Sequence, residues 1–508
     1  MADKGAEGKR STISVEELAV FCKKKGFIFK NSEIYGGLAG IHDYGPMGSE
    51  MKRNIQNAWW TEFVRKRPDV VGIDGSTISH SKVWEASGHV QNFNDPLVMD
   101  VKTKKFYRAD HLIEDALNIA TDAKTWDEMQ KIIIDNGLKS PEGNDISEIT
   151  SFNMMFPVTL GASRDSSATA YLRGETAQNI FVDYKNVIDT ARVKLPFGIA
   201  QIGRAYRNEI SPRDFLFRLR ELEMMEIEYF YNPENEAAFE ELSSWNEFDK
   251  REIMLLTKEE QGRGDDKMNA TPVTIAEMIS KGLLKKIHAY WLVKSLEFYE
   301  SLGLRKEKLR VREHTKDELS HYSSATFDID YEFPFGFKEI YGIADRGNYD
   351  LSQHEKHSRQ KMAFHDDATN TKVVPHVIEP SFGVDRLFMA LLIDAYEDDL
   401  ERGNIALHLK GSIAPVYTAV MPLVSNNEDI VRISKETFDM LIEKGKNIFY
   451  DKSGSIGRRY ARQDEIGTPY CITIDHQSIE DNTVTIRDRD TKEQKRVAIK
   501  QLWSEING

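Results

Sequence analysis

Between Phe197 and Phe230, an apolar and strand-like stretch of the sequence contains an unusual density of arginine and glutamate: FGIAQIGRAYRNEISPRDFLFRLRELEMMEIEYF. Charged side chains are almost never fully buried unless they are paired or held by a ligand. The segment 211–214, SPRD, is a turn signal between two runs of strand character, so the pattern predicts an antiparallel hairpin. Residues two apart on a strand share a face. The hairpin is therefore expected to lay arginines, carboxylates and apolar side chains on one surface.

The residues of this surface indicate its chemistry. Arg207 and Glu209 share a face of the first run, and alternate positions of the second run carry Arg218, Arg220, Leu222, Met224 and Glu226. Guanidinium groups bind phosphates and carboxylates through paired hydrogen bonds, and carboxylates bind ammonium groups. The surface suits a nucleoside triphosphate beside a small zwitterion. A solvent-exposed ladder of salt bridges is the alternative interpretation.

Length and composition limit the class of protein. A chain of 508 residues exceeds one ordinary core, so two or three domains are expected. No apolar stretch approaches a membrane span, and the polar start lacks an export signal. With Cys22 and Cys471 as the only cysteines, neither a disulfide framework nor a cysteine zinc site is expected. The net charge of −14 argues against a nonspecific nucleic-acid coat but permits a local basic patch. We expect a cytoplasmic protein without membrane contact.

The order of elements indicates two domains. Helices are predicted from Ser14 to about Lys25 and from Met47 to the residue before Pro68. Two helix-prone insertions, at about 110–150 and 232–320, are expected within a domain of residues 1–412. Strand signals at 324–332, 338–343 and 372–378 precede a predicted helix over 383–395. Alternating strands and helices over 413–508, closing with a helix at 496–506, predict a second, α/β domain.

Three segments then appear in a diagnostic order. They are Tyr44-Gly45-Pro46 before a long helix, the YRNE strand with its loop, and EPSFGVDR entering an apolar helix. Together they resemble motifs 1, 2 and 3 of class II aminoacyl-tRNA synthetases. Over essentially the whole chain the resemblance is to glycyl-tRNA synthetases of the homodimeric type, carried by the strings EIYGG, HDYGP, YRADH, ETAQ, RNEISPR and IEPSFGVDR. No HIGH-like or KMSKS-like pair supports a class I synthetase.

The resemblance implies a fold, a reaction and partners. The expected fold is a class II antiparallel-sheet catalytic domain with helical insertions, followed by an α/β anticodon-binding domain. The implied reaction activates glycine with ATP to glycyl-adenylate and transfers glycine to the 3′ end of tRNA(Gly). ATP would act with Mg²⁺, and no zinc is expected. A homodimer is expected, with Pro46 and the following helix at its interface.

The same resemblance assigns the catalytic and ATP-binding residues. Arg207 is expected to bridge the α-phosphate and the amino-acid carboxylate, Arg218 to meet the γ-phosphate, and Arg386 to stack over adenine. These three are the expected catalytic residues, and Glu339 is a candidate for holding Mg²⁺. The full expected ATP set is Arg207, Asn208, Glu209, Phe217, Arg218, Arg220, Leu222, Glu339, Ile340, Gly383, Val384, Asp385 and Arg386.

Glycine recognition is expected to use a cage of carboxylates. By resemblance, Glu175, Glu226 and Glu379 surround the ammonium group with Ser381, and Arg108 lies at the same site; Leu222 and Gly383 complete the set. Glycine has no side chain to recognise, so alanine must be rejected sterically. Without the ammonium, like-charge repulsion should raise the pKa of at least one of these carboxyls. Gly383 is expected to let the backbone approach the nucleotide, although a simple turn glycine is the alternative.

Several features depart from the family pattern or leave alternatives. Leu222 stands where an aromatic residue usually stacks on adenine, and Gly174 and Asn179 replace an expected proline and glycine. Histidines at 354, 357 and 365 are interpreted as solvated loop residues instead of a zinc site. One-turn spacing makes Arg458, Arg459 and Arg462 candidates for RNA phosphate contacts, or for a solvated helix face. A class II synthetase for serine, threonine or proline, and a noncatalytic nucleic-acid-binding accessory protein, are the alternative functions.

Overall fold

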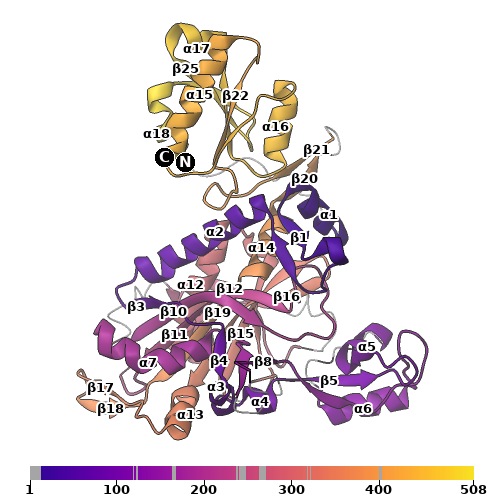
Figure 1. The fold of residues 1–508 in the computed structure, drawn as a ribbon. Helices are drawn as coiled ribbons and strands as arrows, with labels where there is room; N and C mark the ends of the chain where they lie inside the picture. Colours follow the sequence, from indigo (N-terminus) through magenta and orange to yellow (C-terminus); the bar gives the residue numbers. More distant parts are fainter. Residues whose placement is uncertain are drawn as a thin grey trace.

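A nine-stranded sheet forms the centre of the larger body of the protein (Figure 1). The structure is a computed structural model and describes residues 13–117, 119, 121, 124–162, 168–235, 238, 248–261, 270–316, 318–320, 322–399 and 403–507. The strand order is β13-β12-β14-β15-β16-β19-β11-β10-β3, and most neighbours are antiparallel. The strands are β3 (Val70–Ile73), β10 (Phe197–Tyr206), β11 (Glu221–Tyr231), β12 (Glu252–Leu256), β13 (Thr271–Thr274), β14 (Leu309–Glu313), β15 (Ala325–Phe333), β16 (Gly336–Gly347) and β19 (His376–Gly383).

Helices cover both faces of this sheet. Successive side chains along each strand point to opposite faces, and apolar side chains on both faces need to be covered. In β11, Met225, Ile227 and Tyr229 pack into the core shared with α2 (Pro46–Trp60), α12 (Lys286–Leu302) and α14 (Val384–Ala395). Phe230, of the opposite parity, packs with α7 (Ala177–Ala191). Glu226 and Glu228 share the parity of Phe230, so these buried carboxylates face away from the α12 and α14 core.

The predicted hairpin is confirmed, with Phe197 opposite Phe230 and Tyr206 opposite Glu221. Four of its expected strand residues lie elsewhere. Arg207, Glu209, Arg218 and Arg220 belong to the connecting loop, although the Arg207 amide still donates to the Arg220 carbonyl at 2.9 Å. Left-handed backbone at Asp214 and Phe215 (φ 59° and 57°) turns the chain inside this loop. The arginines are therefore presented by a loop that the two strands hold at its ends.

Most other predicted elements are present with small changes at their ends. The helix α1 (Val15–Lys25) begins with a capping box between Ser14 and Glu17, and α2 continues as a π-helical turn, Thr61–Arg65. The strand expected over 372–378 is split into β18 (Thr371–Val373), which pairs with β17 (Phe364–Asp366), and the sheet strand β19. Pro375, which has no amide hydrogen to donate, lies between the two.

The first insertion is larger than predicted and contains strands. A subdomain projects from the body (Figure 1), built on β5 (Asn94–Met99), β6 (Phe106–Arg108) and β7 (Thr150–Asn153). Its helices are α5 (Ala109–Leu117) and α6 (Trp126–Asp135). Val98, Ile113 and Ile133 contribute to its own small core.

Segment 232–320 was expected to be a mostly helical insertion, and α12 is the longest element among its described residues, but strands that were not expected are also present. This segment supplies β12, β13 and β14, which extend the central sheet, together with α11 (Ile275–Ser280) and α12. Buried Ile253, Leu255 and Val311 place these strands in the main core. The abundant charges of the segment obscured this short alternation of buried apolar positions.

Smaller elements complete the body. They are β1 (Ile28–Lys30), β2 (His42–Tyr44), β4 (Ile78–His80), β8 (Phe156–Thr159), β9 (Thr169–Leu172), β20 (Tyr396–Asp399), β21 (Asn404–Leu407), α3 (Ser81–Ala86), α4 (His89–Asn92) and α13 (Tyr349–Ser358). None of the helices in the described part of the chain is long and apolar enough to cross a membrane.

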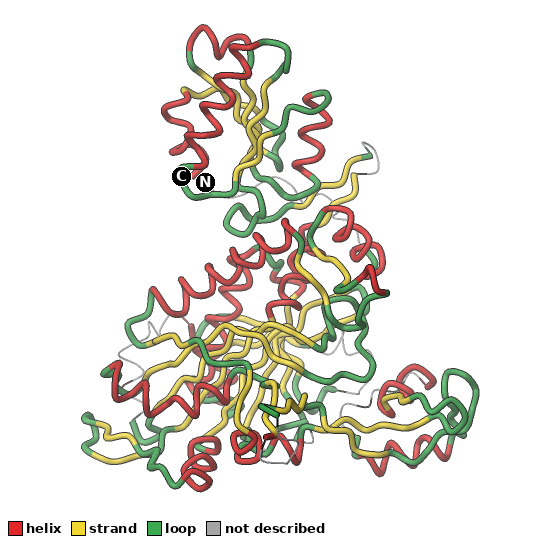
Figure 2. The backbone as a smooth tube through the Cα atoms, viewed as in Figure 1, coloured by secondary structure: helices red, strands yellow, loops and turns green. Residues whose placement is uncertain are grey.

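The C-terminal unit has a separate five-stranded sheet, flanked by helices (Figure 2). Its order is β23-β22-β24-β25-β26, from β22 (Thr418–Pro422), β23 (Ile448–Tyr450), β24 (Tyr470–Ile474), β25 (Thr483–Asp488) and β26 (Gln494–Ala498). Its helices are α15 (Glu428–Ile442), α16 (Ile456–Asp464), α17 (His476–Asp481) and α18 (Leu502–Asn507). The closing helix predicted over 496–506 instead begins as the edge strand β26, with Val497 packed on the core.

Candidate active site

A hollow of about 620 Å³ lies beside the hairpin loop and brings together three distant segments of the chain. Its lining is Arg207, Glu209, Leu216, Phe217, Arg218, Leu219, Leu222, Glu223, Met224, Glu339, Ile340, Ser381, Gly383, Asp385 and Arg386. The pairing of β11 with β19, and of β19 with β16, places these segments next to one another. Of the residues predicted to bind ATP, only Asn208, Arg220 and Val384 are outside this lining.

Arg386 and Phe217 form one side of the hollow. The Arg386 guanidinium lies 4.3 Å from the centre of the Phe217 ring, a cation–π arrangement. Its Nη1 is 3.0 Å from the Glu339 carboxylate and donates to the Glu339 carbonyl at 2.9 Å. The guanidinium plane is thereby held at the start of α14, next to the aliphatic Leu222.

Gly383 is open toward the same hollow. A Cβ added there would meet only the Arg386 side chain, at 3.8 Å, and the backbone φ of −81° is accessible to any residue. Neither the turn nor the packing of the protein requires glycine at this position. The free space supports the interpretation that a ligand approaches the backbone here.

Arg207, Arg218 and Arg220 differ in what they contact. Arg207 lines the hollow, and its Nε is 3.3 Å from the Gly174 carbonyl, next to Glu175. Arg218 lines it as well and contacts His111. Arg220 instead donates to the main-chain carbonyls of Glu209 and Ala39, at 2.8 and 3.1 Å. Its guanidinium therefore stabilises the loop instead of facing the hollow.

The expected carboxylate cage is assembled and buried. The Glu226 Oε1 accepts a hydrogen bond from the Ser381 hydroxyl at 2.7 Å, and its Oε2 accepts from the Thr176 amide at 2.8 Å. Glu175 accepts from Gln178 at 3.0 Å and lies 3.3 Å from the His89 Nε2. The cage adjoins the hollow through Ser381, which belongs to both.

Arg346 is the cation of this cage, and sequence reasoning missed it. Its fully buried guanidinium donates to Glu379 at 2.6 Å and to both oxygens of Asp350 at 2.7 and 2.9 Å. It also lies 3.6 Å from Glu175. An arginine three residues after the strand signal at 338–343 was the feature of the sequence that could have identified it.

Arg108 lies at a different place from that expected. Its guanidinium pairs with Asp95 and Asp110, each at 2.5 Å, and is 3.6 Å from Glu209. The structure therefore places Arg108 beside the hairpin loop, with its charge already engaged by carboxylates. Glu209 was expected to share a strand face with Arg207, but both of these residues lie in the loop, where Glu209 meets Arg108 at the end of β6.

The electrostatics of the cage agree with the expected carboxylate repulsion. Burial raises the pKa of Glu379 well above its usual range, and Glu175 and Glu226 add to this increase while Arg346 opposes it. Glu228 behaves similarly, because burial and repulsion by Glu379 raise its pKa well above the usual range. Neither Glu228 oxygen has a hydrogen-bond partner within the described residues.

Glu175 shows the opposite shift. Burial alone would raise its pKa, but the charges of His89 and Arg346 lower it below its usual range. The cage therefore combines carboxyls that favour protonation with one that remains ionised. This is the arrangement that a bound ammonium group would complete.

Glu339, the residue expected to hold Mg²⁺, has the carboxylate of Asp328 on the neighbouring strand β15. Asp328 Oδ1 and Glu339 Oε1 both lie near one point above Gly342, 3.6 and 3.8 Å from a Cβ built on that glycine. Hard cations prefer such oxygen ligands, completed by phosphate and water. No cluster of three or more His, Cys, Asp or Glu residues in the described ranges is arranged to hold a metal ion by itself.

Two further sequence interpretations need correction. His354 is buried in α13 and lies 2.9 Å from the Gln178 Oε1, so it supports the cage instead of being solvated; His357 and His365 are exposed. Arg459 is buried in α16, and its guanidinium donates to the carbonyls of Pro422 and Leu423 at 2.6 and 3.1 Å.

The other two candidates for RNA contact differ from Arg459. Arg462 pairs with Asp451 at 2.7 Å, and Arg458 is exposed. The three arginines therefore do not form one exposed face, because Arg459 lies on the buried side of its helix.

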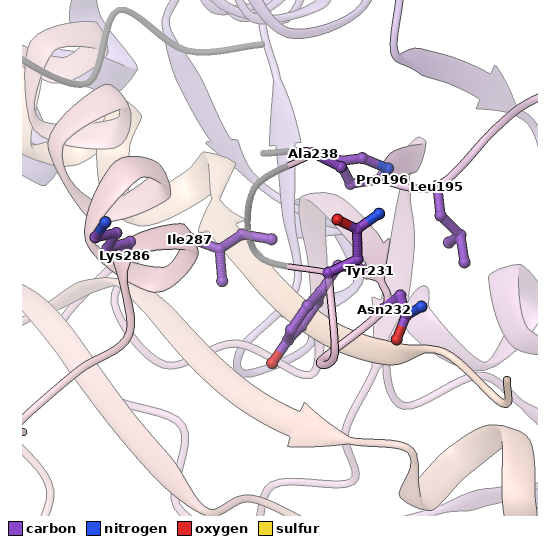
Figure 3. A pocket seen from close by; sticks show the side chains of 8 residues that line it. Leu195, Pro196, Tyr231, Asn232, Ala238, Lys286 and Ile287 are labelled. Atoms are coloured by element: carbon purple, nitrogen blue, oxygen red, sulfur yellow. The ribbon is translucent and has the colours of Figure 1, made fainter. Parts of the chain in front are cut away.

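A second cavity, of about 380 Å³, lies away from these residues (Figure 3). Its labelled lining includes Leu195, Pro196, Tyr231, Asn232 and Ile287. None of the predicted site residues contributes to it, so the arginine-lined hollow remains the candidate active site.

Comparison with known proteins identifies the family. Over 502 residues the chain is 41% identical to a glycine–tRNA ligase of Staphylococcus haemolyticus, covering 96% of this chain and 97% of that protein. Over 499 residues it is 43% identical to a glycine–tRNA ligase of Geobacillus thermodenitrificans, covering 96% of each. The chain belongs to the glycine–tRNA ligase family.

Two other comparisons concern the architecture of this family member. Residues 418–508 match the model of the anticodon binding domain family. A solved prolyl-tRNA synthetase of Cryptosporidium parvum, complexed with L-proline and AMP, superposes with a TM-score of 0.57 at 14% identity. The match covers 97% of this chain and 74% of that one, and it confirms the predicted class II fold.

Proposed function

We propose that the chain is a glycine–tRNA ligase, which activates glycine with ATP and transfers it to tRNA(Gly). The observation that carries this conclusion is the junction of two sites. An arginine-lined hollow suited to a nucleotide adjoins a buried carboxylate cage suited to an ammonium group, and Ser381 belongs to both. Whole-length similarity to glycine–tRNA ligases supports the same reaction.

In the first step, a carboxylate oxygen of glycine attacks the α-phosphorus of ATP. The bond from that phosphorus to the bridging oxygen breaks, and pyrophosphate leaves with the electron pair. Arg207 and Arg218 would stabilise the charge on the phosphates, and Arg386 would hold the adenine. Glu339 and Asp328 would hold the Mg²⁺ that accompanies ATP, which supplies further neutralisation of phosphate charge.

In the second step, the 3′-hydroxyl of the terminal adenosine of tRNA attacks the activated carbonyl carbon. The ester bond to tRNA forms, AMP leaves, and the hydroxyl proton is released. No side chain forms a covalent intermediate, so alignment and charge are the proposed sources of rate acceleration. The unit matching the anticodon binding domain is the proposed site of contact with the distant part of the tRNA.

Glycine selection would depend on the buried cage. Glu175, Glu226 and Glu379 would bind the ammonium group. When no substrate is bound, the positive charge of Arg346 would offset the repulsion among these carboxylates and keep them together. Hydrogen bonds from Thr176 and Ser381 hold both Glu226 oxygens in place. A cage fixed in this way leaves little room to expand around the methyl group of alanine.

The proposal includes a homodimer that works in the cytoplasm, where tRNA is charged. Ile34 and Tyr35, each 87% exposed, lie in a short 3₁₀ helix (Glu33–Tyr35) before β2 and the Pro46 helix. Large apolar side chains exposed together favour a protein interface. Analytical ultracentrifugation should therefore give the mass of two chains, and a Tyr35→Asp variant should shift toward one.

The decisive test is ATP–pyrophosphate exchange with glycine, alanine, serine, threonine and proline in turn. Exchange with glycine alone is expected. Exchange with another amino acid would keep class II chemistry but overturn the cage assignment. No exchange with any amino acid, by folded protein with Mg²⁺, would favour the noncatalytic accessory function.

A further inference from the structure

The projecting subdomain contacts the hairpin loop through one face of α5. His111, Glu114 and Asp115 are spaced to share this face. The His111 Nε2 lies 2.5 Å from the Arg218 Nη1. Arg213, from the same loop, lies 3.7 Å from both Glu114 and Asp115. Two loop arginines are thus engaged by a helix that belongs to a separate small core.

The contact between His111 and Arg218 defines the state of the imidazole. A guanidinium donates hydrogen bonds and accepts none, so the Nε2 must be the acceptor and the ring proton is on Nδ1. Burial lowers the pKa of His111 to about 3; the charge of Asp110 opposes this shift, and the charges of Arg218, Arg108 and Arg213 add to it. The ring is therefore neutral at physiological pH.

A neutral acceptor has a specific advantage at this position. A carboxylate would also orient Arg218, but it would cancel the charge that the guanidinium brings to a phosphate. Arg218 lines the nucleotide hollow and contacts a neutral ring, so its positive charge is kept. Burial lowers the pKa of Arg218, and Glu209 has the largest opposing effect among the surrounding charges.

The imidazole is itself fixed in place. Asp110 accepts a hydrogen bond from the His111 amide at 2.8 Å and pairs with Arg108 at 2.5 Å. Arg108 also reaches Asp95 on β5. This network ties the first turn of α5 to two strands of the subdomain, so the position of the ring follows the position of the whole subdomain.

We propose that His111 is a positioning residue, whose neutral Nε2 holds the Arg218 guanidinium toward the terminal phosphates of ATP with its charge undiminished. This role deepens the proposed function and rests on it. The subdomain then acts on the nucleotide site through α5, and no residue of α5 needs to touch the reacting atoms.

The test compares three variants of the full-length chain. His111→Leu removes the acceptor, His111→Gln supplies an amide oxygen in its place, and His365→Leu is a control at an exposed histidine on β17. We expect His111→Leu to raise the KM for ATP, and the KM for pyrophosphate in the reverse direction, by about 10-fold or more, as for one hydrogen bond to a charged group. The KM for glycine should change little, His111→Gln should recover most of the loss, and His365→Leu should match the wild type.

A double-mutant cycle separates positioning from general damage. In an Arg218→Lys background, His111→Leu should add little to the loss, because the partner of the imidazole has already changed. Additive effects in the cycle, or a parallel rise in the KM for glycine, would overturn the positioning role. Unchanged KM values in His111→Leu would also overturn it while leaving glycine-dependent exchange, and hence the proposed function, intact. Wild-type protein without such exchange would overturn both.

Discussion

At the scale of single residues, Arg386 and Leu222 determine how the proposed nucleotide site treats adenine. Arg386 is held by Glu339 and lies over Phe217, so one cationic plane is already oriented. Leu222 offers an aliphatic surface in the same hollow, where the family pattern has an aromatic ring. Phe217 supplies an aromatic group nearby from a different position of the loop. The hollow therefore still contains an aromatic ring, although residue 222 is aliphatic.

Arg207 is the residue whose removal should most affect glycine activation. Its guanidinium lines the hollow and reaches toward the cage through the Gly174 carbonyl. Arg207→Ala should lower glycine-dependent exchange by about 100-fold or more, the size of effect seen when one preorganised charge-stabilising donor is lost. Arg204→Ala, at an exposed residue of β10 paired with Glu221, is the control and should retain activity. Retention of most exchange by Arg207→Ala would contradict its assigned role.

Glu228 should make the stability of the protein depend on pH. Its folded-state pKa is raised by burial, above an unfolded value of about 4.3. The protonated form is favourable below the unfolded pKa, and this contribution is lost as pH rises toward the folded pKa. Glu228→Gln should therefore raise the melting temperature more at pH 8 than at pH 5. An equal change at both values would show that Glu228 does not titrate in this range.

Some site residues were predictable from sequence and others were not. Arg207, Arg218 and Arg386 stand in motifs whose order along the chain is diagnostic. Arg346 and His111 were missed as functional residues because their importance comes from partners distant in sequence: Glu379 for the first and Arg218 for the second. Contacts of this kind depend on strand pairing and subdomain placement, which local patterns do not specify.

At the scale of elements, the hairpin was predictable because two long alternating runs flank a proline-containing turn. The position of its arginines could not be predicted, because the loop extends from residue 207 to residue 220 and contains residues with left-handed backbone. Similarly, the closing helix predicted from Arg496 included the last three residues of the edge strand β26, since the polar residues of this strand face solvent and only Val497 marks the core side. Short elements with one buried position carry a weak periodic signal.

The helix α16 offers a matched pair of substitutions. Arg459 is buried and donates to three main-chain carbonyls, those of Pro422, Leu423 and Asp451, whereas its neighbour Arg458 is exposed. Arg459→Ala should destabilise the C-terminal unit by about 2 kcal/mol or more, because buried acceptors lose their partner. Arg458→Ala should leave stability unchanged but weaken tRNA charging if this face meets RNA. Thermal denaturation and charging assays separate the two effects, and equal destabilisation would refute the contrast.

At the scale of the whole molecule, ion pairs among the described residues connect the C-terminal unit to the body. Lys25 of α1 pairs with Glu465 beside α16, and the His408 Nδ1 lies 2.6 Å from Asp490. His408 follows β21, which is part of the body, and Asp490 follows β25. Apolar packing adds to these pairs, because Ile466 of the C-terminal unit packs against the main core, which includes Leu407 and Leu409.

Loosening this junction should affect tRNA charging without affecting glycine activation. In a Glu465→Gln, Asp490→Asn double variant, proteolysis of the connection between the units should accelerate by several-fold, because fewer contacts oppose local opening. Glycine-dependent exchange should remain close to wild type, while tRNA charging should fall. Lys495→Gln, which alters an exposed pair inside the C-terminal unit, is the control. Loss of exchange in the double variant would show that the units do not act separately.

The place of β19 in the central sheet has a consequence for biosynthesis. This strand lies between β16 and β11, although it follows both in the sequence. During translation, the halves of the sheet on either side of it emerge first and lack the strand that joins them. Glu379, Ser381 and Arg386 emerge with or just after β19, so a nascent chain arrested before residue 376 has neither a complete sheet nor a nucleotide site. Until then, the exposed edges of β16 and β11 are the surfaces that a ribosome-associated chaperone would have to protect.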